Sequence, residues 1–320
     1  GRPHLALTSE DRDERNSDAV SLHSGCPSSV YIDGWDEVLP SSSFITNGDD
    51  GNSESYFTRD LQELLLLERG PNGARPLYTF ASGATYLGQW CGNTRHGMGK
   101  QTWVDGATYV GQWVNNFAEG RGEFLHADRD LFVGEWVRSA AQGNGVYHHR
   151  RGLTTYSGQW EDDLQHGHGV EEWEGGSIYN GQYVRGKKKG FGTFRWPDSS
   201  EYLGSWVNGS FNGHGVYRGT DGREFRGEWR NALIHGRGRY AWPDGRSFWG
   251  QYAEDQKEGF GVFSWKDGRH FRGFWSGGKQ HGNGTVFKAS GEVALTGTWR
   301  HGRLPDMPEP SDGIPLLTLS

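Results

Sequence analysis

The chain has 320 residues and a formal net charge of −7, with 52 glycines and only 33% hydrophobic residues. Because 15 tryptophans, 13 tyrosines and 16 phenylalanines make up much of that hydrophobic share, a packed interior must be built on rings and not on aliphatic side chains. The net negative charge argues against nucleic-acid binding. The presence of only two cysteines favours a reducing, cytoplasmic compartment. The longest apolar run is too short to cross a membrane.

Residues 1–57 are predicted to be a disordered acidic arm. They are rich in serine, aspartate, asparagine and glycine and show no periodic apolar pattern. Residues 1–80 carry 6 basic and 14 acidic side chains, whereas residues 81–302 carry 26 and 23. No basic stretch followed by an apolar run is present, so we expect no secretory signal in this sequence.

The segment 58–69 is expected to be a short helix. Thr58 is suited to cap its start, Leu61 and Leu64 lie on an apolar side, and Gly70 follows its end. One hypothesis is that this helix folds back and covers the exposed first edge of the sheet predicted below. The alternative is that it binds a partner or mediates dimerisation.

A five-residue pattern, aromatic-x-Gly-x-aromatic, recurs ten times at spacings of 23 or 24 residues, the last copy being incomplete. In nine copies a Gly-x-Gly pair follows seven residues after the second aromatic residue. The first copy is defined by Tyr86, Gly88, Trp90, Gly97 and Gly99. Equivalent positions in later copies are Tyr109, Gly111, Trp113, Tyr156, Trp160, Tyr202, Trp206, Phe225, Trp229, Phe271 and Trp275.

Each copy is predicted to form a β-hairpin. Side chains alternate between the faces of a strand, so the two aromatic residues and the glycine of one copy share a face. Glycine within a strand is unfavourable unless another group approaches its backbone, and we expect a ring of the neighbouring hairpin to lie over it. Asp-Gly pairs such as Asp105-Gly106 supply the turns between copies.

The predicted fold class is therefore all-β, an elongated single-layer antiparallel sheet of stacked hairpins. The array is expected to span residues 70–302, between the short helix and a proline-rich tail at 303–320 that we expect to be frayed. The sheet is expected to present its aromatic-and-glycine face and two open edges to partners.

These features resemble the MORN repeat (membrane occupation and recognition nexus) over about 220 residues. In the first copy the resemblance is carried by Tyr86, Gly88, Trp90, His96, Gly97, Gly99, Asp105 and Gly106. Tyr183 and Tyr252 depart from it by replacing tryptophan, and the last copy lacks its Gly-x-Gly pair, as a terminal cap would. The resemblance implies scaffolding of cytoskeletal or membrane-apposed complexes, self-association and phospholipid binding.

The residues that carry chemistry elsewhere do not form an active site here. The histidines that precede Gly-x-Gly pairs lie two or three repeats apart, too far to share a metal ion. Glutamates such as Glu171 and Glu174 have no facing carboxylate across a cleft, because a flat sheet offers none. No helix follows a Gly-x-Gly pair, so none is a phosphate loop. We therefore predict no enzyme, no cofactor and no metal.

One charged patch is a candidate for binding an anionic lipid or a partner. Arg185, Lys187, Lys188 and Lys189 fill a predicted hairpin turn, and Arg150 and Arg151 lie in a longer turn. At about 1 kcal/mol for each basic residue near an anionic surface, the first turn supplies about 4 kcal/mol, which alone gives only weak peripheral membrane contact. A solvated turn is the alternative.

The sequence thus predicts a non-enzymatic scaffold that binds protein partners, cytoskeletal or membrane-associated, and a second copy of itself. Two alternatives stay open. One is a targeting segment of a larger signalling enzyme such as a phosphoinositide kinase, and the other is a direct phosphoinositide binder. The predicted location is the cytoplasm, in association with the cytoskeleton or a membrane.

Overall fold

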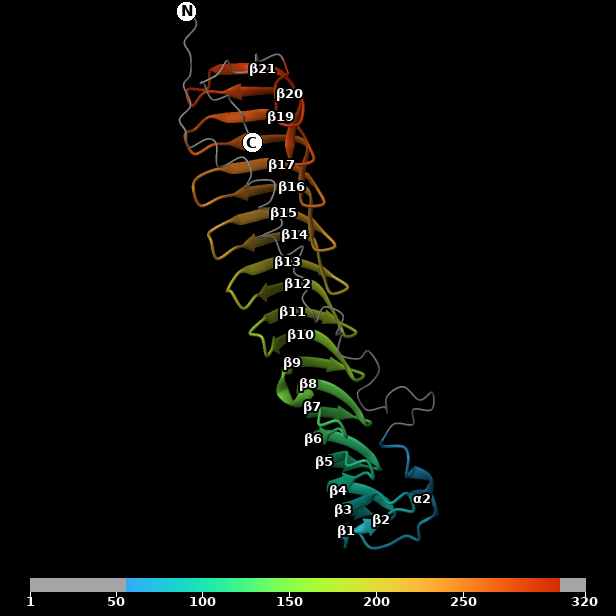
Figure 1. The fold of residues 1–320 in the computed structure, drawn as a ribbon. Helices are drawn as coiled ribbons and strands as arrows, with labels where there is room; N and C mark the ends of the chain where they lie inside the picture. The colour runs from blue at the N-terminus through green and yellow to red at the C-terminus, as the bar shows by residue number, and fades with distance from the viewer. Residues whose placement is uncertain (1–55, 306–320) are drawn as a thin grey trace, which may run out of the picture. The chain divides into compact units, whose positions relative to one another are not determined.

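The computed structural model describes residues 56–305 (Figure 1). The arm predicted to be disordered lies outside the described residues up to residue 55, as does the tail from residue 306. Contacts divide the chain into two compact units, residues 34–197 and residues 1–33 with 198–320, and each is described by itself.

The described part of the first unit begins with a short helix and continues as antiparallel strands. Its elements are α2 (Leu61–Leu66), β1 (Gly73–Ala74), β2 (Tyr78–Thr79), β3 (Thr85–Cys91), β4 (Thr94–Thr102), β5 (Thr108–Val114), β6 (Phe117–Leu125), β7 (Leu131–Val137), β8 (Ala140–His149), a 3₁₀ turn (Arg150–Gly152), β9 (Thr154–Glu161), β10 (Leu164–Trp173), β11 (Ile178–Val184) and β12 (Lys187–Arg195). From β3 onward each strand pairs with the next in the sequence.

The second unit has the same construction without a helix in its described part. Its strands are β13 (Glu201–Val207), β14 (Ser210–Arg218), β15 (Glu224–Arg230), β16 (Leu233–Ala241), β17 (Ser247–Ala253), β18 (Gln256–Ser264), β19 (His270–Ser276), β20 (Lys279–Phe287) and β21 (Val293–Trp299). Consecutive strands again pair antiparallel. The predicted all-β, single-layer fold of stacked hairpins is therefore confirmed in each unit.

Two-residue turns with left-handed backbone close most hairpins. Arg185 and Gly186 have φ of 49° and 77° between the paired residues Val184 and Lys187. Positive φ at both turn residues matches the right-handed twist of the strands, which favours asparagine, aspartate and glycine. Other turns of this type are Asn115-Asn116, Asp162-Asp163, Asn208-Gly209 and Glu254-Asp255.

The constant offset to the Gly-x-Gly pair has a structural cause. The register slips after Gly88, and Gly97 lies at this bulge with φ of 71°. The Gln89 side chain fills the space beside Gly97 and accepts a hydrogen bond from the Met98 N–H at 2.8 Å. At a φ of 71° any side chain is strained, and a Cβ on Gly97 would also displace Oε1 of Gln89, so glycine is strongly favoured there.

The repeat rings form a buried face, which we call the ring face. Tyr86 packs edge-on against Trp90 of its own hairpin and Trp113 of the next, with ring centroids 5.1 and 5.6 Å apart. The Trp113 indole donates to the carbonyl of Gly99 at 3.2 Å and so ties its hairpin to the one before it. Trp136, Trp160, Trp229 and Trp275 make the same bond. All the aromatic residues that define the repeats are buried.

Two expectations about these rings need correction. The ring over the glycines belongs to the same hairpin, because a Cβ on Gly99 would lie 2.2 Å from the hydroxyl oxygen of Tyr86. The aromatic-and-glycine face is also not presented to partners, since its rings pack against one another and the bare glycines. The side that is left for contacts is the opposite, outward face.

The short helix lies next to the first strands of the sheet. Helix α2 is shorter than predicted because Leu65 and Leu66 are exposed, so no packing supports further turns. The first edge is covered by β1 and β2, which pair with β3. The helix lies against these first elements, where it is held through buried Leu64 and through Glu63, whose carboxylate accepts the Tyr78 hydroxyl of β2.

Candidate binding surfaces

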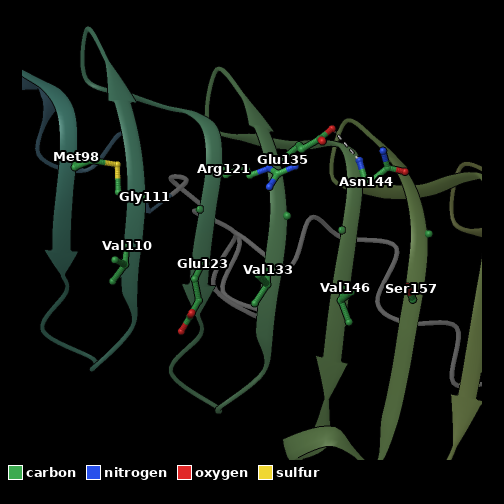
Figure 2. Close-up of a pocket in the computed structure, with 14 residues that line it drawn as sticks. Met98, Val110, Gly111, Arg121, Glu123, Val133, Glu135, Asn144, Val146 and Ser157 are labelled. Carbon is green, nitrogen blue, oxygen red and sulfur yellow. Dashed lines mark hydrogen bonds between the residues drawn. The ribbon is translucent and has the colours of Figure 1, made fainter.

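A groove of about 580 Å³ lies on the outward face of strands β4–β9 (Figure 2). It is shallow and open to solvent, so it is not the dry-floored cleft that a flat sheet is expected to lack. Its floor is a row of glycines that pair with one another across successive strands. The floor residues are Gly111, Gly122, Gly134, Gly145 and Gly158. Their N–H and C=O groups lie in the ladder of the sheet, so a ligand must be recognised mainly by side chains.

Two rows of outward side chains form the walls of this groove. One row pairs in register from β5 to β9 and is largely apolar; it consists of Val110, Glu123, Val133, Val146 and Ser157. The other row is polar, with Met98 at its start; it consists of Met98, Arg121, Glu135 and Asn144. The groove therefore joins an apolar wall to a charged one.

The charged wall is fixed by contacts with the backbone. The Glu135 carboxylate accepts the N–H of Asn144 at 3.1 Å, which is the same bond that Gln89 makes in the first repeat. Arg121 is exposed and lies opposite Glu135 in the register of β6 and β7. Val110 and Val133 are 42% and 43% exposed and lie in one row with Val146, so their apolar surface is continuous along the wall.

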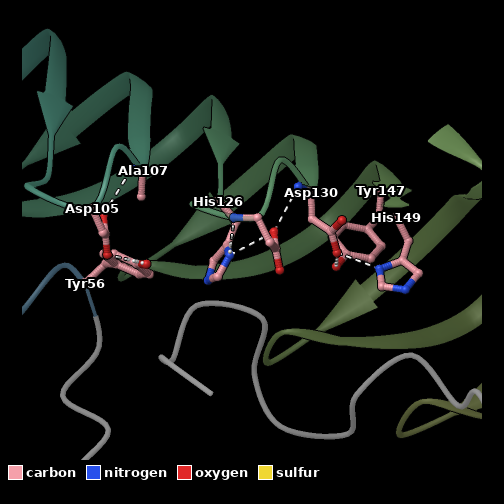
Figure 3. A network of polar contacts seen from close by, with 8 residues as sticks. Tyr56, Asp105, Ala107, His126, Asp130, Tyr147 and His149 are labelled. Carbon is pink, nitrogen blue, oxygen red and sulfur yellow. Dashed lines mark hydrogen bonds and ion pairs between the residues drawn. The ribbon is translucent and has the colours of Figure 1, made fainter. Parts of the chain in front are cut away.

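A polar network follows the turns at one margin of the ring face (Figure 3). Buried Asp130 accepts hydrogen bonds from the Tyr147 hydroxyl and lies 2.6 Å from Nδ1 of His149. Burial first, and then the adjacent Asp130 carboxylate, raises the pKa of Tyr147 well above its ordinary value. Tyr56 donates to Asp105 at 2.7 Å in the same row. The hydroxyl, carboxylate and imidazole groups of this network are hydrogen-bonded to one another. We therefore interpret the network as structural.

The basic residues of the predicted patch do not all lie at the exposed turn. Arg185, Lys187 and Lys189 are exposed at the turn between β11 and β12, but Lys188 points to the ring face. There its ammonium lies 2.7 Å from the buried Glu171 carboxylate and 4.8 Å from the Trp173 ring. Lys188 therefore serves packing and contributes no charge to the turn.

The two arginines of the longer turn lie elsewhere. The Arg150–Gly152 turn joins the end of β8 to the start of β9, where His149 pairs with Thr154. The register across β9, β10 and β11 places this turn at the opposite end of the strands from Arg185. The predicted basic residues therefore do not converge on one site.

The described residues 56–305 contain no group of three or more histidine, cysteine, aspartate or glutamate residues that could hold a metal ion. Within the same range no helix has the length and apolar character needed to span a membrane. The groove was not predicted from the sequence. The sequence did contain an indication of it. Val110 and Val133 occupy the second position of the aromatic-x-Gly-x-aromatic pattern, whose side chains point away from the rings.

The sequence pattern of the MORN repeat family matches nine consecutive segments of the chain. The segments are residues 86–108, 109–130, 132–154, 156–178, 179–201, 202–222, 225–245, 250–268 and 271–293. A comparison with curated proteins gives no significant match.

Two solved structures show a distant likeness. A mutant of the TCP10 domain of Danio rerio CPAP is 12% identical, with a TM-score of 0.35, covering 70% of this chain and 100% of that chain. The SAS-4 (dCPAP) TCP domain of Drosophila melanogaster, in complex with a proline-rich motif of Ana2, is 15% identical, with a TM-score of 0.32, covering 57% and 94%. TM-scores this low do not establish a common fold.

Proposed function

The chain belongs to the MORN repeat family, and from this premise we propose that it is a non-enzymatic scaffold that binds an extended segment of a partner protein in the outward groove. The groove supports this proposal because it is an exposed, partly apolar channel that the packing of the repeats does not use. Exposed apolar side chains arranged in a row are a feature of interaction surfaces.

The dimensions of the groove favour an extended segment. It crosses strands β4 to β9, and strands lie about 4.8 Å apart, so it is about 24 Å long. A fully extended chain covers this length with about seven residues. An extended segment laid across the strands can therefore contact both rows of side chains along the whole length of the groove.

The chemistry of the walls specifies the segment. Val110, Val133 and Val146 accept apolar side chains along one wall, and Arg121 and Glu135 present opposite charges along the other. A matching segment has apolar residues on one side and residues of both charges on the other. The closed ladder in the floor prevents strand addition, so affinity depends on these side chains.

The lipid alternative is weakened by the position of Lys188. With that ammonium paired to Glu171, only three exposed basic residues remain at the turn, and they supply about 3 kcal/mol near an anionic surface. We therefore propose a partner protein as the target and, from the family resemblance alone, place it in a cytoskeletal or membrane-associated assembly of the cytoplasm. A targeting role within a larger signalling enzyme is compatible with the same groove.

A peptide library displayed on phage and selected against the full chain tests the proposal. We expect selected peptides to lose binding to the double variant Val110→Lys/Val133→Lys. The control variant Val114→Lys/Val137→Lys changes valines of the same two strands that are 41% and 48% exposed but lie outside the groove, and it should bind normally. Peptides that bind all three proteins equally would contradict a role for the groove.

Self-association is a separate part of the proposal. A second copy of the chain is the expected partner in the absence of others, as the family resemblance implies. Light scattering over a range of concentrations measures the mass directly. A strictly monomeric mass at high concentration would remove the second copy as a partner and leave the peptide result unaffected.

A further inference from the structure

The outward face of the second unit carries arginines and an exposed ring where the groove of the first unit has valines. One of its rows of side chains pairs in register from β15 to β19, and we call it the arginine row. It consists of Arg226, Arg239, Trp249, Val262 and Arg272. The Trp249 side chain is 59% exposed, and those of Arg239 and Arg272 are also exposed. Exposed tryptophan beside arginine is typical of the centre of a protein interface.

The arginines of this row differ in how they are paired. The Arg226 guanidinium lies 2.6 Å from the Glu224 carboxylate. Within residues 56–305, by contrast, neither Arg239 nor Arg272 forms an ion pair with another described residue. Arg226 and Arg239 are also paired across β15 and β16, and like charges directly opposite each other destabilise a sheet. The charge of Arg239 therefore serves no contact of the fold.

The acidic residues of the surrounding strands do not neutralise this surface. Strands β16, β17 and β19 contain no aspartate or glutamate. On β15, Glu224 is ion-paired with two arginines, and Glu228 accepts the N–H of Arg237 at 3.1 Å. On β18, Glu258 accepts the N–H of Gly277 at 2.9 Å. A carboxylate for Arg239 and Arg272 would have to come from another molecule.

A second outward row adds apolar surface next to the first. Phe260 and Phe274 are paired across β18 and β19, with ring centroids 5.6 Å apart, and Phe274 is 50% exposed. The Arg272 guanidinium lies 5.7 Å from the Phe260 ring, so the cation is positioned beside these rings. Cations and rings thus form one continuous surface over strands β16–β19.

We propose that the outward face of strands β16–β19 binds an extended acidic segment of a partner protein, whose carboxylates pair with Arg239 and Arg272. The charge complementarity of the two exposed arginines supports this occupant. The inference is independent of the proposed function, because it concerns residues of the second unit and the groove lies in the first.

The spacing of the two arginines specifies the segment. Arg239 and Arg272 are three strands apart, which is about 14 Å at about 4.8 Å for each strand. Two residues that are four positions apart in an extended chain are separated by about the same distance, and their side chains share one side. The matching segment therefore has two acidic residues four positions apart. An apolar residue midway between them lies over Trp249 and Val262.

A single-stranded nucleic acid fits this surface less well. Its bases could stack on an exposed ring such as Trp249. It carries a phosphate at every nucleotide, however, and phosphates between the two arginines would lie against Val262, which offers no hydrogen bond. The chain also has a net charge of −7, which opposes binding of a polyanion. An acidic segment with an apolar residue between its carboxylates avoids this mismatch.

Fluorescence anisotropy with two labelled peptides of equal composition tests the site in the full chain. The spaced peptide is Glu-Ser-Phe-Ser-Glu-Ser-Phe-Ser-Glu, and its isomer is Glu-Glu-Glu-Ser-Ser-Ser-Ser-Phe-Phe. At low salt we expect the spaced peptide to bind at least about fivefold more tightly, because only its carboxylates match the distance between Arg239 and Arg272. Equal affinities of the two peptides would overturn the proposal.

Variants locate the binding on this face. Arg239→Ala/Arg272→Ala should weaken binding of the spaced peptide at least about tenfold, and Trp249→Ser about threefold. The control Lys266→Ala/Lys279→Ala removes the same charge from exposed positions outside both rows and should change the affinity less than about twofold. All these side chains are exposed, so denaturant unfolding should match that of wild type.

Two results with these proteins would also overturn the proposal. Equal losses in the two double variants would show a general attraction to positive charge instead of a site. Tighter binding of an oligothymidylate of about 12 nucleotides, or of phosphatidylserine vesicles, through Arg239 and Arg272 would replace the acidic segment as the occupant.

Discussion

Asp163 carries a charge that the fold does not favour, and replacing it with asparagine should stabilise the protein. It is the second residue of the turn between β9 and β10, with φ of 65°, and its Oδ1 accepts the Ala141 N–H at 2.6 Å. Burial raises the pKa of Asp163 from 3.8 to about 6, against the opposing effect of that hydrogen bond. Asn116 makes the equivalent bond to the Arg95 N–H at 2.7 Å in an earlier repeat.

The size of the expected stabilisation follows from the pKa shift of Asp163. Each pKa unit corresponds to about 1.4 kcal/mol, so ionised Asp163 costs the folded state about 3 kcal/mol at neutral pH. Because the folded-state pKa is the higher one, the cost is full above pH 6 and disappears below the unfolded value of 3.8. Asparagine keeps the acceptor and tolerates the left-handed backbone without the charge.

Denaturant unfolding of wild type and Asp163→Asn at several pH values measures this effect. We expect the variant to be more stable by up to about 3 kcal/mol at pH 7.5, with the gain vanishing as the pH falls toward 4. Asp163→Ala, which loses the acceptor, should fall below Asp163→Asn by about 2 kcal/mol. Asp162→Asn, at the exposed neighbour, should give only a small gain. A gain of the same size at pH 4 and pH 7.5 would disprove the reasoning.

Two further substitutions test the packing of the ring face by thermal or denaturant unfolding. Gly99→Ala should destabilise by at least about 2 kcal/mol, because its Cβ would lie 2.2 Å from the Tyr86 hydroxyl, and a wild-type stability would contradict the ring-over-glycine contact. Lys188→Ala should cost about 3 kcal/mol by leaving buried Glu171 without its cation, while Lys189→Ala, at an exposed position, should change little. Equal effects of the two lysine variants would place both side chains in solvent.

The hairpins could be predicted from the sequence because several local signals agree. Period, turn chemistry and alternation of side chains all indicate the same strands, and no distant contact is needed to form them. Which glycine a ring covers could not be predicted, since Gly88 and Gly99 are paired neighbours under the same Tyr86 ring. A spacing rule does not distinguish a ring of the same hairpin from one of the next.

Contacts made by residues outside the repeats were not predictable either. Arg95 is fully buried at a position where later repeats have Ala118 and Ala141. Its guanidinium lies 4.3 Å from the Trp113 ring and donates to the carbonyl of Phe57. Burial lowers the pKa of Arg95 to about 10. The guanidinium also donates to Gln101 and to the Asn116 carbonyl within the array, but the Phe57 contact comes from the segment before the array, which no repeat pattern includes.

The inward and outward faces of the repeats obey different constraints, and this explains why the family pattern specifies the fold and not the partner. The inward positions that define the repeat hold rings or glycine, because a ring and the bare backbone of paired glycines fill the same space in each hairpin. Outward positions have no such requirement, so they differ between the two units. Val110 and Val133 line the groove of the first unit, whereas the equivalent positions of the second are Arg226 and Trp249. On the proposed function, a segment that fits the valine wall does not fit Arg226 and Trp249, so we expect specificity to lie in the residues that the repeat leaves free.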